Sequence, residues 1–133
     1  GMLYFFAAMD DYIGYESPLH NPSGEWPKGR LVVKYAKSIN FETFQTCMLV
    51  GDEDEQLTEN ELEIVFSECE DEAEGIKMLS NDLPGSYSDH TNLLKLVSDS
   101  VSGLDFGSGR LDFVIKNSDL GFGNWKKTKA VLG

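Results

Sequence analysis

His20 and His90 are the residues best suited by type to acid–base chemistry near neutral pH. Serines lie close to both in the sequence, but a Ser–His nucleophile needs a third group and a local context such as G-x-S-x-G, which this sequence lacks. Ser88-Asp89-His90 is also typical of a helix-capping turn. The two histidines are therefore weak catalytic candidates, each of which needs the fold to bring it a partner.

The acidic residues that begin at Asp52 match part of a calcium-binding EF-hand loop. The six ligand positions of such a loop hold Asp52, Asp54, Gln56, Thr58, Asn60 and Glu63. Position 6, which needs glycine for a sharp turn, is Leu57, and position 8 is Glu59 instead of an apolar anchor. A strand pattern precedes the loop where an EF-hand has a helix. We therefore expect no metal site here.

The net charge of the protein resides in one segment, residues 52–74. The chain carries 23 acidic and 11 basic residues, for a formal net charge of −12 at pH 7. The segment contains no Lys or Arg, and its acids are Asp52, Glu53, Asp54, Glu55, Glu59, Glu61, Glu63, Glu68, Glu70, Asp71, Glu72 and Glu74. Such a face repels phosphates, so we expect neither nucleic-acid nor membrane binding there.

Our leading hypothesis is a non-enzymatic protein-interaction module, comparable to an inhibitor or an antitoxin, that binds a basic partner. Concentrated negative charge steers a cationic surface and accelerates its association. The expected contacts are Asp52, Glu53, Asp54, Glu55, Glu59 and Glu61. The simpler alternative is a solvated face that only keeps the protein soluble.

The stretch from Asp10 to Gly29 supports a rival hypothesis, a small-ligand-binding protein or small enzyme. It is rich in proline and glycine and reads as a long loop, a feature that is uncommon in compact domains and often functional. A pocket beneath it would be lined by Tyr12, Tyr15, His20 and Trp26. The alternative is a loop that only covers one end of the core.

The remaining motifs predict no cofactor. Glycines at 107 and 109 lead into a strand pattern without Gly-Lys-Ser/Thr, so we expect a turn there and no phosphate loop. Cys47 and Cys69 lie among apolar neighbours and read as two reduced, buried thiols, with a disulfide between them as the alternative. No motif indicates a known family.

Hydrophobic patterns predict the elements that would position these residues. Strands are expected at 3–9, as a central strand, at 30–36 and 41–50, as a hairpin, and at 111–116, with Leu111, Phe113 and Ile115 inward. Residues 62–68 read as a strand followed by a helix over 71–81, with one amphipathic helix from Thr58 as the alternative. A second helix is expected after Ser88, with a buried stripe of Leu93, Val97, Val101 and Leu104.

These elements predict an α+β fold that forms a single domain over residues 2–133. Its core would be a mainly antiparallel or mixed sheet of about five strands, with about two helices packed on one face. Gly1 before Met2 is expected to remain from a cleaved tag. No apolar run approaches the roughly 20 residues of a membrane span, so we expect a cytoplasmic protein.

Overall fold

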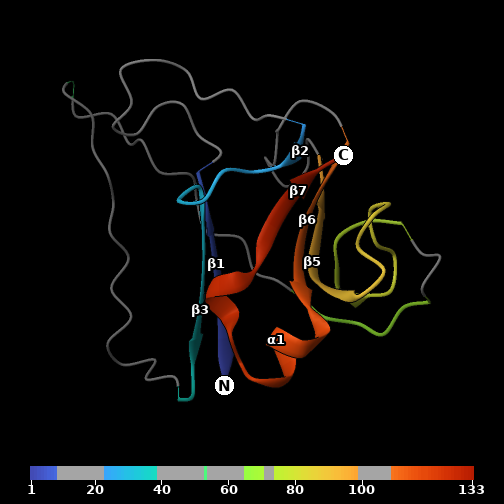
Figure 1. The fold of residues 1–133 in the computed structure, drawn as a ribbon. Helices are drawn as coiled ribbons and strands as arrows, with labels where there is room; N and C mark the ends of the chain where they lie inside the picture. The colour runs from blue at the N-terminus through green and yellow to red at the C-terminus, as the bar shows by residue number, and fades with distance from the viewer. Residues whose placement is uncertain (9–22, 39–52, 54–64, 71–73, 99–108) are drawn as a thin grey trace.

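A computed structural model of the chain describes residues 1–8, 23–38, 53, 65–70, 74–98 and 109–133 (Figure 1). The strands in these residues are β1 (Met2–Ala7), β2 (Gly24–Glu25), β3 (Leu31–Ala36), β4 (Lys77–Ser80), β5 (His90–Val97), β6 (Arg110–Lys116) and β7 (Lys129–Leu132). A short helix, α1 (Asn117–Gly121), and a 3-10 turn, η2 (Trp125–Lys127), connect β6 to β7. Neither is long enough to cross a membrane.

Five of the strands form one antiparallel sheet in the order β2-β7-β6-β5-β4. The predicted strand at 111–116 is confirmed as β6, which lies at the centre of the sheet. Leu111, Phe113 and Ile115 are buried on one face of it, as their alternation predicts. Asp112 and Val114 are also fully buried, so this strand is covered on both faces.

A second, two-stranded sheet covers the apolar face of the first (Figure 1). The strands predicted at 3–9 and 30–36 are confirmed as β1 and β3, which pair antiparallel with each other. Among the described residues β3 is the one strand that pairs with β1, and the predicted strand at 41–50 lies outside them, so the expected central position of β1 stays a prediction. Phe5 meets Phe113 edge to face, with ring centroids 5.3 Å apart.

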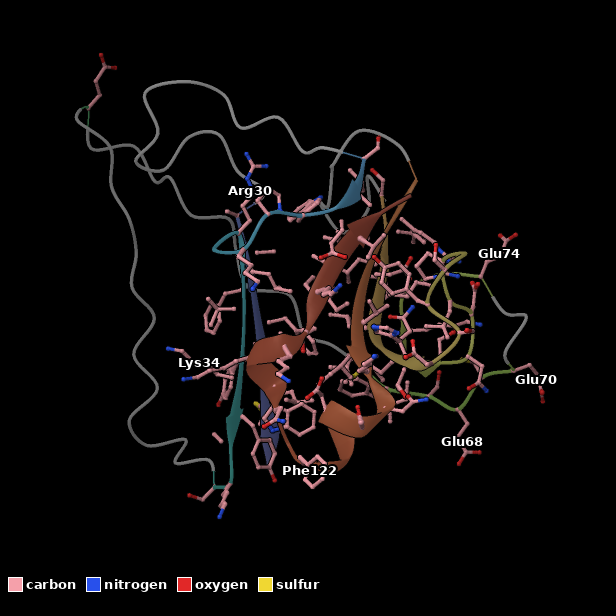
Figure 2. All side chains as sticks on the ribbon, in the orientation of Figure 1. Arg30, Lys34, Glu68, Glu70, Glu74 and Phe122 are labelled. Atoms are coloured by element: carbon pink, nitrogen blue, oxygen red, sulfur yellow. The ribbon has the colours of Figure 1, made fainter. Side chains whose placement is uncertain are left out.

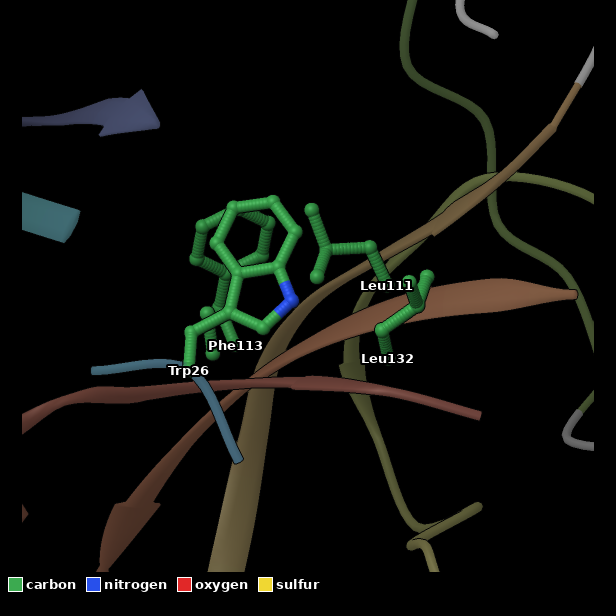
Figure 3. Packing of buried hydrophobic residues seen from close by; sticks show 5 residues of the cluster. Trp26, Leu111, Phe113 and Leu132 are labelled. Carbon is green, nitrogen blue, oxygen red and sulfur yellow. The ribbon is translucent and has the colours of Figure 1, made fainter. Parts of the chain in front are cut away.

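Trp26, which follows β2, completes this core. Its indole packs with Leu111, Phe113 and Leu132 (Figure 3) and is 5% exposed. Burying an aromatic side chain of this size against aliphatic neighbours contributes roughly 2–3 kcal/mol to folding. The segment after β2 is thereby fixed over one end of the sheet.

Both predicted helices are wrong. The helix expected over 71–81 is replaced by β4 at Lys77–Ser80, and the helix expected after Ser88 is replaced by β5 at His90–Val97. The strand expected over 62–68 is also not seen, because its described part, residues 65–68, has no regular secondary structure. The fold is therefore richer in sheet than an α+β fold with two helices on one face.

A β-bulge interrupts the regular pairing of β5 with β6. The register with β6 shifts between Asn92 and Leu94, so Leu93 has no partner opposite it. The extra residue breaks the alternation of period two. Asn92 and Lys95, three positions apart, consequently share one face of the sheet, a spacing that is otherwise typical of a helix.

The face of the sheet opposite the apolar core carries a partly buried ionic network, in which Asp112 is fully buried and Asp82 is partly exposed. The Asp112 carboxylate accepts hydrogen bonds from Asn92 Nδ2 at 2.6 Å and Arg110 Nε at 2.9 Å. Arg110 also donates to Asp82, which in addition accepts from Lys95 Nζ at 3.0 Å. Burial raises the pKa of Asp112, against the hydrogen bonds from Asn92 and Arg110. Hydrogen bonds from Lys95 and Arg110 lower the pKa of Asp82.

We expect the wild type to lose stability relative to the Asp112→Asn variant as pH rises. Because the pKa of Asp112 is raised on folding, the folded protein loses stability as pH rises from about 4, the ordinary aspartate value, through the raised pKa. The free energy of unfolding of the wild type, relative to the variant, should therefore fall across that window and level off above it. Urea denaturation at a series of pH values measures this difference.

Asp119→Asn provides the control of opposite sign. Hydrogen bonds from Lys127 and Asn124 lower the pKa of Asp119, so its contribution to stability is lost as pH falls below about 4. The free energy of unfolding of the wild type, relative to Asp119→Asn, should therefore rise with pH. The raised pKa of Asp112 would be contradicted if the free energy of unfolding of the wild type, relative to Asp112→Asn, did not change with pH or rose with it.

Candidate functional site

Most of the site residues expected from the sequence lie outside the described residues. These are Tyr12, Tyr15, His20, Asp52, Asp54, Glu55, Glu59 and Glu61, together with the remaining EF-hand positions. Glu53 is described and exposed. The two others, Trp26 and His90, are both described, and the structure brings them to the same place.

A groove of about 740 Å³ lies between the segment after β2, the start of β5 and the connection from β6 through α1 and η2 to β7. We call it the Trp26 groove. Its lining includes Trp26 and His90, which are 64 positions apart in the sequence. The structure thus places part of the 10–29 stretch, residues 25–29, along a concave surface at the end of the sheet.

One side of the Trp26 groove is built on a three-residue polar contact. Glu25 Oε2 accepts hydrogen bonds from Lys129 Nζ at 2.9 Å and from the Tyr87 hydroxyl at 3.0 Å. The Lys129 hydrogen bond lowers the pKa of Glu25 and, in return, raises the pKa of Lys129. Burial, followed by the Glu25 contact, raises the pKa of Tyr87. These groups stay in their ordinary charge states around neutral pH.

His90 lies against the same cluster. Its ring meets that of Tyr87 edge to face, with centroids 5.0 Å apart, and its side chain is 11% exposed. Nδ1 lies 2.6 Å from Oδ1 of Asp89, close enough for an ion pair when the imidazole is protonated. Asp89 is also 3.4 Å from Lys116 Nζ. His90 therefore has the carboxylate of the preceding residue as its neighbour.

Polar and charged side chains make up most of the lining of the Trp26 groove. Among its described lining residues there is no serine or cysteine to act as a nucleophile beside His90. Five lysines face three carboxylates along it, so its local charge is positive. Within the described part of the chain, no three His, Cys, Asp or Glu residues are placed to hold a metal ion.

The described part of the acidic segment is fully open to solvent. Residues 65–70 and Glu74 are exposed, with Val65 at 83% and Phe66 at 73%. Cys69 is exposed and unpaired, so its expected burial is wrong, because this part of the segment is not packed into a core. Cys47 lies outside the described residues.

The fold separates the charges of the protein. Figure 2 shows Glu68, Glu70 and Glu74 beyond β5, on the side opposite Arg30 and Lys34. Eight of the 11 cations lie in two stretches, residues 28–37 and 116–129, which meet where β3 contacts η2. The sequence shows the lysines of each stretch, but only the tertiary contact between β3 and η2 brings the two groups together.

No known protein family, curated protein or solved structure matches this chain.

Glu25→Gln is expected to lower the pKa of Tyr87 toward the ordinary tyrosine value of about 10. The substitution removes a carboxylate whose charge and hydrogen bond favour the protonated phenol, while the effect of burial remains. A pH titration of the Tyr87 ring signals by NMR measures the change. Asp119→Asn, the same change of charge in the same groove, should leave the pKa of Tyr87 unaltered. Equal shifts in both variants would contradict the Glu25–Tyr87 contact.

Proposed function

We propose that this protein is a non-enzymatic interaction module that binds a basic protein surface through its acidic segment, residues 52–74. The observation that carries the proposal is the exposure of Phe66 beside Glu68 and Glu70, with Glu74 close in sequence. An apolar anchor among carboxylates is the combination that a cationic partner recognises.

The carboxylates of this surface are available to a partner. Glu68, Glu70 and Glu74 form no ion pair within the described residues, whereas Glu25, Asp82, Asp89, Asp112 and Asp119 each contact a cation. Binding a basic surface would therefore add ionic contacts without breaking existing ones. Each such exposed pair contributes roughly 0.2–1 kcal/mol, and three together give about a tenfold effect on affinity.

Phe66 supplies the part of the binding energy that charge does not. Aromatic residues are enriched among the few interface residues that dominate affinity. Moving most of the Phe66 side chain out of water would contribute roughly 1–2 kcal/mol. A solvated face that serves only for solubility gains nothing from an exposed phenylalanine.

A second candidate function is the binding of a small ligand in the Trp26 groove. The observation that favours it is the convergence of Trp26, His90 and several lysines on one concave surface. Its lining contains none of the described residues of the acidic segment. The two candidate functions can therefore be separated by mutation.

The interaction proposal is tested with a synthetic peptide rich in Lys and Arg that also carries an apolar face. A variant with Glu68→Gln, Glu70→Gln and Glu74→Gln should bind it about tenfold more weakly by calorimetry, and the affinity of the wild type should fall with salt. Phe66→Ala should weaken binding further and leave the melting temperature unchanged, because its side chain is 73% exposed.

The matched control carries Asp10→Asn, Asp11→Asn and Glu16→Gln, the same change of net charge outside the segment. It should retain wild-type affinity for the peptide. If the control weakens binding as much as the segment variant, and Phe66→Ala has no effect, the segment acts only through net charge and the proposal is wrong.

A further inference from the structure

The outer face of the β1–β3 sheet is apolar and exposed, with a single charged residue. Successive residues of a strand point to opposite faces, and the inner face of this sheet holds Phe5 and Leu31, which pack against the core. The outer face therefore carries the alternate residues, which pair across the strands as Met2 with Ala36, Tyr4 with Lys34 and Phe6 with Val32. Phe6 is 54% exposed and Val32 45%. We call this surface the β1–β3 outer face, and contiguous apolar exposure of this kind is typical of an interaction site.

Lys34 gives the β1–β3 outer face a positive charge. Its Nζ lies 5.8 Å from the centroid of the Phe6 ring, so the ammonium group and the aromatic ring share this face. Lys34 forms no ion pair within the described residues. The stretch around it, residues 28–37, contains three further cations and no acid, and β1 has no charged residue. A partner that fits this face would therefore present an apolar side chain together with carboxylates.

The acidic segment of the same chain has this composition. Val65 and Phe66, which are 83% and 73% exposed, are followed by Glu68 and Glu70. Lys77 of β4 donates a hydrogen bond to Glu70 O at 3.1 Å, which holds the end of this stretch beside an edge strand of the main sheet. Residues 65–70 therefore combine apolar side chains with carboxylates at a fixed place on the molecule.

The two surfaces do not meet within one molecule. Figure 2 shows Glu68 and Glu70 on the side opposite Lys34. A contact between them therefore joins two copies head to tail, through different patches, and can repeat from copy to copy. A symmetric contact between two β1–β3 outer faces would instead bring like charges together, as would one between two acidic segments, and like charges oppose association.

We propose that this chain binds a second copy of itself head to tail. Phe66 of one copy packs on Phe6 and Val32 of the next, and the carboxylates at positions 68 and 70 pair with Lys34 there. This inference rests on the proposed function, because it names the basic surface that the acidic segment recognises. The net charge of −12 on each copy opposes the contact, so it is weak and needs enough salt to screen the charges that lie outside it.

Sedimentation velocity of the full chain in about 0.15 M salt, over a range of protein concentrations, tests the proposal. The sedimentation coefficient of the wild type should rise with concentration. The face variant carries Phe6→Ala and Lys34→Gln, and it should associate roughly tenfold more weakly. Lys34→Gln alone alters only an exposed side chain, and it should weaken association a few-fold even if the double variant proves unstable.

The Phe66 variant, with Phe66→Ala, Glu68→Gln and Glu70→Gln, alters the other side of the contact. It should also associate roughly tenfold more weakly than the wild type. It carries less net negative charge than the wild type, so an effect of net charge alone would strengthen its association. The loss expected here is therefore specific to the contact.

Mixing the two variants distinguishes a head-to-tail contact from a symmetric one. The face variant keeps the acidic segment intact, and the Phe66 variant keeps the β1–β3 outer face intact. An equal mixture therefore holds one complete pair of surfaces. It should form complexes that contain one copy of each variant and grow no larger, whereas a mixture that fails to associate would contradict the proposal.

The matched control carries Lys28→Gln and Phe122→Ala, which remove one exposed lysine and one exposed phenylalanine outside both surfaces. It should associate as the wild type does. The proposal is overturned if the control loses as much association as the face variant, or if either the face variant or the Phe66 variant associates like the wild type. A wild type that stays monomeric at every concentration but binds the basic peptide overturns this inference and leaves the proposed function standing. Failure of both results contradicts both.

Discussion

Asp112 imposes the constraint on which the rest of the structure depends. It is a carboxylate with no exposed surface on the central strand of the main sheet, and an uncompensated charge there would be strongly destabilising. Asn92 and Arg110 bind it directly, and Arg110 with Lys95 then holds Asp82 from the chain after β4. Lys95 and Arg110 therefore lie on this face of the sheet, paired with carboxylates. Lys77 is buried on the same face and donates a hydrogen bond to Glu70 O. The other eight cations all lie elsewhere, on the two stretches around β3 and η2.

Packing on the opposite face of the sheet brings the two stretches of cations together. Leu111, Phe113 and Trp26 form an apolar surface that the β1–β3 sheet covers. This packing places the end of β3 against η2, and the Tyr35–Trp125 contact joins them. Lysine-rich stretches from distant parts of the sequence consequently meet where β3 contacts η2, while Glu68, Glu70 and Glu74 lie on the side opposite Arg30 and Lys34 (Figure 2). The same two-sided burial that stabilises the sheet therefore produces two surfaces of opposite charge.

The sequence predicts the parts of this fold that follow a regular pattern. β1, β3 and β6 are found from short apolar runs or from alternation, because none of them contains an extra, bulged residue of its own. β5 is missed because the spacing of four between Leu93 and Val97 favours a helix, and the bulge at Leu93 interrupts the alternation that marks a strand. β4 is missed for a related reason, since Leu79 has a positive φ of 55° and Lys77 and Ser80 share a face. The Trp26 groove depends on contacts such as Glu25–Lys129, 104 positions apart, which no local pattern encodes.

The central claim is that this acidic protein carries a positively charged surface opposite its acidic one. The most direct measurement is NMR relaxation of the amide protons with cationic and anionic nitroxide probes of the same shape. The anionic probe should relax the amides of residues 34–35 and 124–127 more than the cationic probe does, and residues 65–70 should show the reverse. If the cationic probe is the more effective one at every amide, the net charge of −12 dominates the whole surface and the account is wrong.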